Sequence, residues 1–533
     1  MKRPLYIVVA TLVLWSGACD SGVDSERIVI AEATDIGVLL PALETSALDG
    51  EINSQLYLSL NSARWENGRL EYAIDDLSLA ERWEFSGDST VLLYFLRDDA
   101  VWSDGHPIDA DDVVFTFELI RNPEVGSVYI DAWENLDSVV VVSRHEVAFH
   151  FKRRYPGMLF DTGIGIVPQH VFQDAAVDHA TLAGHPALID PADNLVVSGP
   201  YRVAEWVQGD RLVLVANPQA FTREPATDTV VFRVLPEPLT RLIEVENGSA
   251  DVTGPLAMDE IERLAARPNL RIETVADRFY DYIAWNGSAF EPFGDADVRL
   301  ALSLAIDRSE ILAGLGIDPY ARPAGGPYPP IFGDVVDPTV TPDPYLPDSA
   351  GTILTAQGWS DSDGDGVLDR DGHSFRFTLL TQAGNQRRES AAEIIQARYA
   401  DIGIDMQIRL VDFNSLLGLM FEERDFEAVL MGWQVALEPD YLVGFFWPPD
   451  HPFNITGYAN PKLDEIIPLA QAAATAGLAA PHWRAAAKVI SLDRPYAFLW
   501  YFDDAVAVNQ RIQNTRIDTY GLYQNLYQWR VRN

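Results

Sequence analysis

Residues 375–410 read FRFTLLTQAGNQRRESAAEIIQARYADIGIDMQIRL, and three periodic segments follow one another within this stretch. Phe375–Leu380 is a short apolar run typical of a buried strand, and Ser390–Tyr399 repeats its apolar residues with helical spacing. Gly403 favours the end of that helix, and apolar residues then alternate with polar ones over Ile404–Leu410, as in a second strand. This order predicts a parallel pair of strands joined by a right-handed crossover. The stretch therefore predicts an α/β fold.

The N-terminal half mixes strands with one clearly marked helix. Short β-branched or aromatic runs bounded by polar residues predict strands at Ile28–Ala31, Val91–Leu96, Val139–Val142 and Val147–Phe149. The helix begins after Asp109, a residue type that caps helices, and ends at Asn122-Pro123.

Length and composition limit the class of protein. The chain has 533 residues, of which 48% are apolar and 22% charged. This is more chain than one hydrophobic core organises, so we expect two or three lobes, and it is too apolar for a disordered protein. The 39 basic and 79 acidic residues give a formal net charge of -40. Such a surface repels phosphate backbones, which argues against nucleic acid as a partner.

The single cysteine, Cys19, stands at the end of a segment with the features of an export signal. A basic pair opens the chain, an apolar run follows from Leu5 to Trp15, and three small residues precede the cysteine. The run is too short for a membrane span, which needs about 20 residues. The position resembles the lipobox of bacterial lipoproteins, where the cysteine becomes the acylated N-terminus, although Ser16 stands where that pattern usually has leucine. The alternative is an ordinary signal peptide that contains a cysteine by chance.

We therefore expect residues 1–18 to be a removable signal peptide and residues 19–27 to be a lipidated leader. The mature chain would keep 37 basic and 79 acidic residues, a net charge of -42. Its body would lie on the periplasmic or extracytoplasmic side of the cell envelope, anchored to a membrane through Cys19.

Two short patterns resemble those of hydrolases. His145-Glu146 with His150 has the residue types of a zinc-protease helix, but the second histidine lies one residue too far along and the neighbours are typical of strands. Asp161-Thr162-Gly163 matches the aspartic-protease triplet, whose chemistry needs a second carboxylate. The only companion, Asp20-Ser21-Gly22, lies beside the predicted cleavage site. We therefore expect that the protein is not an enzyme, and a secreted hydrolase based on Asp161 remains the least favoured interpretation.

An acidic loop offers the one candidate metal site. Asp361, Asp363, Asp365 and Asp369 occupy positions 1, 3, 5 and 9 of a calcium-binding loop, with glycine at position 6. Position 12, normally a bidentate glutamate, is Gly372. The alternative, which we prefer, is a solvated acidic turn. We therefore expect no cofactor, with calcium as the competing hypothesis.

Ordered segments along the whole mature chain resemble one family. The strongest is Leu96–Phe115, LRDDAVWSDGHPIDADDVVF. The others, in order, are Ile166–Phe172, Ser198–Val203 with Trp206, Val298–Arg308, Gly358-Trp359 with the Asp- and Gly-rich turn after it, and Gly432-Trp433. They are similar to the extracellular solute-binding proteins of ABC transporters, in the large family that binds peptides, oligopeptides, nickel and related solutes. Most of these residues are expected to support the fold: Trp102 to pack against the helix after it, and Arg299 and Asp307 to form ion pairs.

The resemblance implies a two-lobe periplasmic-binding-protein-like fold of type II, with an additional domain inserted in the first lobe. The implied boundaries are 26–57, 190–277 and 503–533 for the first lobe, 58–189 for the insert and 278–502 for the second lobe. Lobes of this kind close on a solute like a hinged clamp.

The predicted site combines strand ends with the family pattern. Ligands of α/β sheets bind beyond the carboxyl ends of strands, which points to Glu32 after the first strand and to the segment that begins at Trp433. In related peptide binders, an aspartate a few residues after the Gly-Trp pair holds the N-terminal ammonium of the peptide. Here that place holds Val435-Ala436, and the nearest acids are Glu438 and Asp440. The predicted solute-binding residues are Glu32, Trp433, Gln434, Glu438 and Asp440.

The favoured function is that of the solute-binding component of an ABC importer. It would act as a monomer, capture a peptide-like solute and deliver it to ABC permease subunits. The alternative keeps the fold but makes the protein a lipid-anchored ligand sensor or partner protein that is not coupled to transport.

Overall fold

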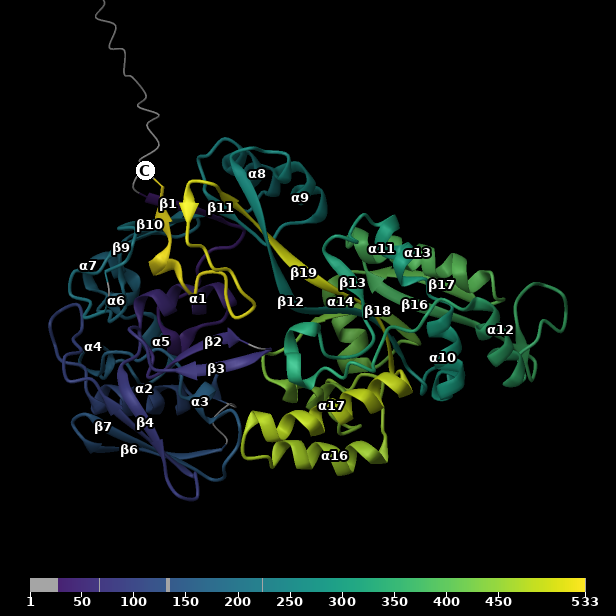
Figure 1. Ribbon diagram of the computed structural model, residues 1–533, viewed down its shortest axis with the longest axis horizontal. Helices are drawn as coiled ribbons and strands as arrows, with labels where there is room; N and C mark the ends of the chain where they lie inside the picture. Colours follow the sequence, from purple (N-terminus) through teal and green to yellow (C-terminus); the bar gives the residue numbers. More distant parts are fainter. Residues whose placement is uncertain (1–26, 67, 131–134, 223, 533) are drawn as a thin grey trace, which may run out of the picture.

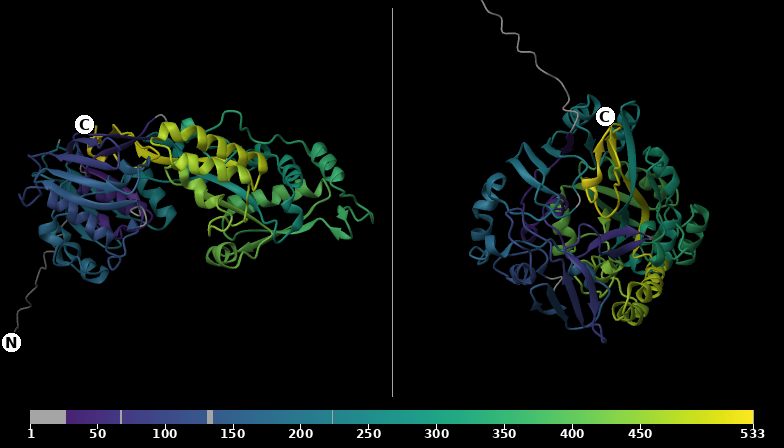
Figure 2. Two further views of the ribbon diagram at one scale, coloured as in Figure 1. Left: turned by 90° about the horizontal axis from the view of Figure 1, so that it is seen from below. Right: turned by 60° about the vertical axis from the view of Figure 1, so that its left-hand side comes forward.

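The computed structural model describes residues 27–66, 68–130, 135–222 and 224–532. The predicted signal peptide and Cys19 lie outside these residues. The described chain forms two α/β lobes that meet at a narrow middle section (Figures 1 and 2). The predicted fold class is therefore confirmed.

One mixed sheet runs through both lobes and has eleven strands among the described residues. Its order is β17 (Asp405–Val411), β16 (Arg376–Gln382), β18 (Ala428–Gln434), β12 (Leu270–Trp285), β19 (Tyr496–Asn509), β11 (Val252–Thr253), β1 (Arg27–Glu32), β10 (Thr229–Val234), β9 (Arg211–Ala216) and β8 (Tyr201–Val207), with β13 (Ala321–Pro323) paired to β19. The helices packed beside its first-lobe part are α1 (Ala47–Leu56), α8 (Pro238–Glu246) and α9 (Met258–Ala265).

Two long antiparallel strands connect the lobes. β12 and β19 pair from Leu270–Asn509 at one end to Ala284–Tyr496 at the other, and they pass through the middle of the molecule (Figure 1). Their register shifts between Ala276 and Phe279. The predicted lobe boundaries at 277–278 and 502–503 fall in this region and stay predictions.

The segment predicted to be an insert carries a second sheet, of order β4 (Ala80–Phe85), β5 (Val91–Leu96), β7 (Glu146–Phe151) and β6 (Leu136–Ser143). Asp109 caps helix α2 (Ala110–Arg121), as the sequence predicted, and the structure shows that Asp112 completes a capping box with it. Trp102 is fully buried and donates to the Asp112 carboxylate at 3.1 Å, so its predicted packing role is confirmed. Shorter helices complete the segment: α3 (Met158–Asp161), α4 (Gln169–Phe172), α5 (His179–Ala183), α6 (Pro186–Ile189) and α7 (Pro191–Asn194).

The second lobe places helices on both faces of the sheet. β16, α13 (Gln386–Ala400) and β17 form the predicted crossover unit, and the two strands are parallel. Alternate residues of β18 enter different cores: Val429 packs beneath α16 and α17, and Leu430 beneath α13. The helices of this lobe are α10 (Ala296–Leu304), α11 (Arg308–Gly314), α12 (Pro347–Ala356), α14 (Phe413–Leu417), α15 (Leu442–Phe445), α16 (Pro461–Gln471) and α17 (Ala476–Asp493).

The predicted ion-pair roles of Arg299 and Asp307 are wrong. Arg299 donates to the backbone carbonyls of Phe293 at 2.7 Å and Asp493 at 2.8 Å. Asp307 instead caps α11 by accepting from the backbone N–H of Glu310 at 3.0 Å. The sequence could not reveal these contacts because their partners are backbone groups, which every residue type offers.

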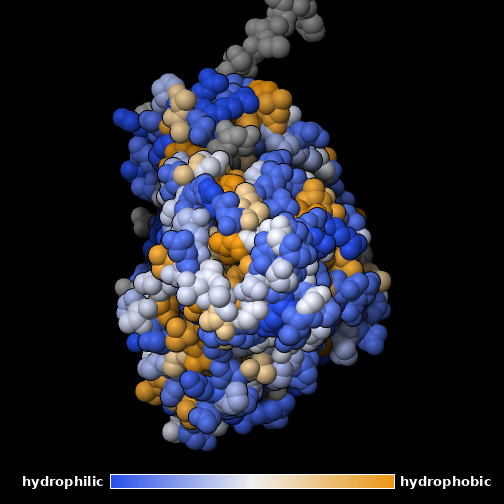
Figure 3. All heavy atoms as spheres, turned by 90° about the vertical axis from the view of Figure 1, so that its right-hand side faces the viewer, coloured by the Kyte–Doolittle hydropathy of each residue, from blue (hydrophilic) through white to orange (hydrophobic). Residues whose placement is uncertain are grey.

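The face of the second lobe that points away from the first lobe shows mainly hydrophilic residues (Figure 3). At the end of the second lobe, apolar side chains appear as scattered patches among polar ones (Figure 3). Within the described chain, no helix combines the length and the apolarity that a membrane crossing requires.

A hairpin from the first half of the chain reaches the second lobe. β2 (Ser62–Glu66) and β3 (Arg69–Ala73) point across the molecule toward residues 330–335 (Figure 1). Trp65 meets Phe332 edge to face, with ring centroids 5.6 Å apart. The hairpin is therefore a lobe-to-lobe contact in addition to β12 and β19.

Replacing Trp65 by alanine is expected to loosen this contact. An aromatic edge contact contributes about 0.5–1.5 kcal/mol, so the lobes should separate more often and the radius of gyration in X-ray scattering should increase. Trp83→Ala is the matched control, because Trp83 packs on Tyr94 within the first half of the chain. An unchanged scattering curve for Trp65→Ala would contradict a bridging role.

Candidate functional site

A cavity of about 820 Å³ lies between the two lobes. Ligand sites usually have volumes of about 300–1,000 Å³. The first lobe and the insert contribute residues around α1, the β2–β3 hairpin and the end of α3, and the connecting strands contribute Val275, Arg278 and Asp504. The second lobe contributes Gln434 and Leu437. Because both lobes line the cavity, their closure would enclose whatever it holds.

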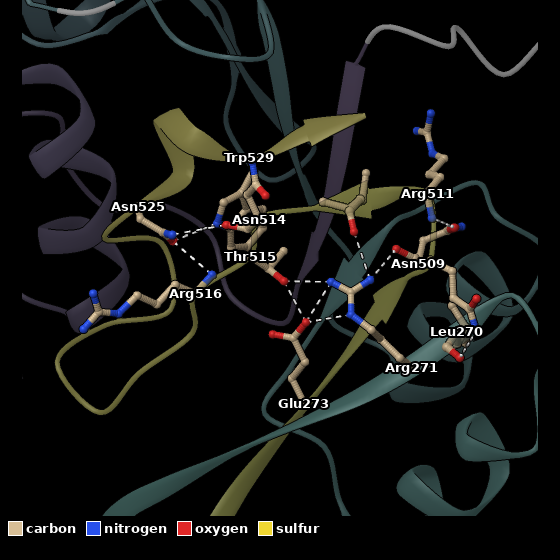
Figure 4. A network of polar contacts seen from close by, with 12 residues as sticks. Leu270, Arg271, Glu273, Asn509, Arg511, Asn514, Thr515, Arg516, Asn525 and Trp529 are labelled. Atoms are coloured by element: carbon tan, nitrogen blue, oxygen red, sulfur yellow. Dashed lines mark hydrogen bonds and ion pairs between the residues drawn. The ribbon is translucent and has the colours of Figure 1, made fainter. Parts of the chain in front are cut away.

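The C-terminal segment forms another part of the wall. Residues 516–528 include ten of the lining positions, among them Asp518 and Tyr520. Arg271 holds the start of this segment, donating to the Glu273 carboxylate and to the Thr515 hydroxyl at 2.7 Å each (Figure 4). Thr515 in turn donates to the same carboxylate at 2.7 Å. This network fixes the C-terminal segment to β12, so the wall moves with the first lobe.

Three acidic side chains of the wall titrate far above their usual range. Burial raises the pKa of Glu44, Glu51 and Asp161 to about 7 each. Each accepts a hydrogen bond: Glu44 from the Tyr129 hydroxyl at 2.6 Å, Glu51 from the backbone N–H of Tyr523 at 2.7 Å, and Asp161 from the Tyr155 hydroxyl. The cavity therefore holds carboxyl groups that change charge near neutral pH.

Comparison with known proteins assigns the family. The sequence pattern of the bacterial extracellular solute-binding proteins, family 5 (middle region), matches residues 77–454. The chain belongs to this family. Its members are binding proteins, and the protein is accordingly the solute-binding component of an ABC importer.

Individual relatives are similar to this chain over most of their length. The oligopeptide-binding protein AppA of Bacillus subtilis is 28% identical over 470 residues, which are 85% of this chain and 83% of AppA. The structure of AppA in complex with a nonapeptide matches with a TM-score of 0.71 and 26% identity, over 95% of this chain and 99% of that one. CtaP of Listeria monocytogenes, at 20% identity and a TM-score of 0.80 over 95% and 99% of the two chains, shares the fold. The two-lobe, family 5 fold implied by the sequence motifs is thus confirmed.

Of the five predicted solute-binding residues, Gln434 is the one in the cavity lining. Trp433 is half-buried and stacks on Phe445, with ring centroids 4.6 Å apart, and more loosely on Tyr282 at 5.9 Å. Neighbouring side chains of a strand point to opposite faces of the sheet, so Trp433 points away from the face on which Gln434 lines the cavity. A direct contact between Trp433 and the solute stays a prediction.

Glu438 stands just behind the wall, and Asp440 follows it two residues later. The Tyr72 hydroxyl, which belongs to the lining, lies 3.3 Å from Glu438 Oε1. Burial and then the negative charge of Asp440 raise the pKa of Glu438 to about 7. Asp440 is exposed at the start of a 3-10 turn. Their roles in solute binding stay predictions.

Glu32 lies at the end of β1, as expected, but outside the cavity lining. Its side chain is 8% exposed and accepts a hydrogen bond from the Tyr523 hydroxyl. The structure therefore places Glu32 under the C-terminal segment, behind the wall that the solute would contact.

The acidic loop brings three of its four predicted calcium ligands together. Carboxylate oxygens of Asp361, Asp363 and Asp369 lie within 4.8 Å of one another, whereas Asp365 is not in this group. Asp361 already accepts from the backbone N–H groups of Gly364 and Gly366, at 2.7 and 3.1 Å. The loop is thus closed by its own hydrogen bonds, and calcium binding stays a hypothesis.

Removing calcium is expected to leave the thermal stability unchanged. The turn already satisfies its carboxylates, so excess EGTA should shift the melting temperature by less than about 1 °C. A larger fall that added Ca²⁺ reverses, and that Asp361→Asn abolishes, would instead establish a calcium site.

Several wall residues were not predicted from the sequence. Glu44 and Tyr72 lie in no recognised motif, and Asp161 was noticed only because it resembles a protease triplet. Burial and the charge of Asp440 raise the pKa of Asp161, whereas the hydrogen bond from the Tyr155 hydroxyl acts in the other direction. The residue types were visible in the sequence, but their shared cavity depends on contacts between distant segments.

Proposed function

We propose that the solute of this importer component is a peptide-like molecule, held between the two lobes and then passed to ABC permease subunits. The observation that carries the proposal is the cavity of about 820 Å³ to which both lobes contribute. AppA, with which the chain shares its fold over 95% of its length, binds a nonapeptide. The protein acts as a monomer in this proposal, since one chain supplies both walls of the cavity.

Titration with short synthetic peptides tests the proposal. Closure should change the fluorescence of the tryptophans and raise the melting temperature in a saturable way, without turnover of the peptide. A pentapeptide set that covers basic, neutral and acidic side chains would show the binding class. The absence of any fluorescence or thermal response to every peptide would contradict a peptide-like solute.

We also propose that Cys19 anchors the mature protein to a membrane. The lone cysteine, the apolar run before it and the family's extracellular location support this proposal. In a bacterial host, Cys19→Ala is expected to move the protein from the membrane fraction to the soluble fraction of the envelope. Labelling with a radioactive fatty acid should mark the wild type alone, and membrane retention of the variant would contradict the anchor.

A further inference from the structure

The cavity wall carries more acidic than basic side chains. The lining includes six carboxylates and three arginines: Glu44, Glu51, Asp75, Asp161, Asp504 and Asp518 against Arg64, Arg278 and Arg516. No lysine or histidine is among the lining residues of the described chain. If every arginine compensated one carboxylate, three acidic side chains would remain without a basic partner.

The arginines are engaged away from the surplus acids. Arg64 pairs with Asp75 at 2.6 Å. Arg516 lies 3.6 Å from the Asp518 carboxylate. Arg278 donates to the backbone carbonyl of Val435 at 2.8 Å. The basic side chains of the wall are thus directed to other partners.

The surplus acids are Glu44, Glu51 and Asp161. Within the described part of the chain, none of the three forms an ion pair with an arginine, lysine or histidine, and their hydrogen-bond partners are uncharged: tyrosine hydroxyls, a backbone N–H group and the Asn53 amide. Glu44 is 7% exposed. A Cβ on Gly50 would lie 3.3 Å from Glu44 Oε2, so this carboxylate rests directly on α1, the helix that carries Glu51. Both acids therefore lie beside α1, on the same side of the cavity.

A second group spans the two lobes. Asp161 lines the cavity from the insert, and Glu438 of the second lobe lies just behind the wall, with its Oε1 atom 3.3 Å from the hydroxyl of the lining residue Tyr72. The charge of Asp440 acts on both acids. Glu438 has no basic partner in the ranges that the structure describes. Like charges that face each other across a cleft repel, so closure is opposed until a positive charge lies between them.

Two amide side chains of the wall have an acceptor oxygen without a donor. Asn53 and Asn61 line the cavity and are almost fully buried, and the Oδ1 atom of each has no hydrogen-bond donor among the described residues. Buried acceptors without donors are unfavourable, and a donor-rich ligand nearby would compensate them.

We propose that the solute carries at least two positive charges, one bound near Glu44 and Glu51 and another between Asp161 and Glu438. This inference rests on the proposed function, because it specifies the solute of the same cavity. Burying a carboxylate without a cation is unfavourable, and a charge-assisted hydrogen bond from an ammonium or guanidinium group removes that penalty. Peptides with lysine or arginine side chains have this chemistry.

Calorimetric titration of three matched peptides tests the charge requirement. The probes are Ala-Lys-Ala-Lys-Ala, Ala-Gln-Ala-Gln-Ala and Ala-Glu-Ala-Glu-Ala, with spermidine as a cation that is not a peptide. The lysine peptide should bind at least about tenfold more tightly than the glutamine peptide, and the glutamate peptide most weakly. Raising the salt concentration from 0.05 to 0.5 M should reduce the preference for lysine.

Two variants locate the charges on the opposite walls. Glu44→Gln and Glu438→Gln keep the shape and the hydrogen-bond acceptor, so each should weaken binding of the lysine peptide about tenfold and leave binding of the glutamine peptide nearly unchanged. Glu118→Gln, on the exposed face of α2, is the control with the same change in net charge.

The outcomes separate the two proposals. Equal affinity for the lysine and glutamine peptides would overturn the charge requirement and leave peptide binding intact. A lysine preference that survives in both variants would overturn the placement at these carboxylates. Binding of spermidine that depends on Glu44, without binding of any peptide, would support the charge requirement and overturn the peptide proposal. No binding of any probe would overturn both.

Discussion

Replacing Asp281 by alanine is expected to lower the free energy of unfolding by about 3 to 5 kcal/mol. Asp281 lies in β12 and is fully buried. Its carboxylate accepts from Arg388 Nε at 2.9 Å and from Arg387 Nε at 3.1 Å. Arg388 is 5% exposed, so the substitution would leave its guanidinium group buried without a counter-ion. Denaturant unfolding followed by circular dichroism measures the loss.

A pair of similar chemistry at the surface gives the control. Asp401 and Arg398 approach to 3.2 Å with both side chains partly or largely exposed. Asp401→Ala should change the free energy of unfolding by no more than about 0.5–1 kcal/mol. Equal decreases in the free energy of unfolding for Asp281→Ala and Asp401→Ala would show that burial does not make the Asp281 ion pair more important for stability.

Replacing Glu32 by glutamine is expected to flatten the dependence of stability on pH. Burial raises the pKa of Glu32 to about 8 from 4.5, although the Tyr523 hydroxyl and Arg241 act in the other direction and Glu51 adds to the rise. Since the folded pKa lies above the unfolded one, the folded state binds the proton more tightly. Its contribution to stability is complete below pH 4.5 and is lost as the pH rises toward 8.

The size of this effect follows from the shift. Between pH 5 and pH 8 the wild type should lose about 3 to 4 kcal/mol of stability that Glu32→Gln does not lose. Urea unfolding at several pH values measures both proteins, and Glu422→Gln at an exposed position serves as the control. Parallel pH profiles for the wild type and Glu32→Gln would refute the assignment. Glu44 and Asp161 add to the same trend in both proteins and cancel in the comparison.

Local patterns predicted the fold well. The strand, helix and strand of residues 375–410 correspond to β16, α13 and β17, and the helix after Asp109 corresponds to α2 with its capping box. These elements were predictable because their hydrophobic period and their capping residues act over a few positions. The ion-pair roles predicted for Arg299 and Asp307 were wrong because the partners of both residues are backbone groups. Any residue type can offer such groups, so the sequence does not identify them.

The site was less predictable. Gln434 was recognised from its place after the Gly-Trp pair, but Glu44, Tyr72 and Asp161 were not. The sequence also does not explain why residue 432 is glycine. In the folded protein, a Cβ at this position would collide with the Arg388 and Asp281 side chains, so the glycine makes room for their buried ion pair. Its role is thus tied to packing between β12, β18 and α13.

The sequence by itself determined the α/β class, the family and the expected export of this protein, because periodicity, caps and ordered motifs are properties of short segments. Only the tertiary structure decided which side chains share the cavity. Glu44 and Asp161 share the cavity although more than a hundred residues separate them, and Glu438, much further along the chain, lies behind the wall at the hydroxyl of the lining residue Tyr72. The charges of Asp161 and Asp440 both act on Glu438. Electrostatic coupling acts through space, so it cannot be read from positions along the chain.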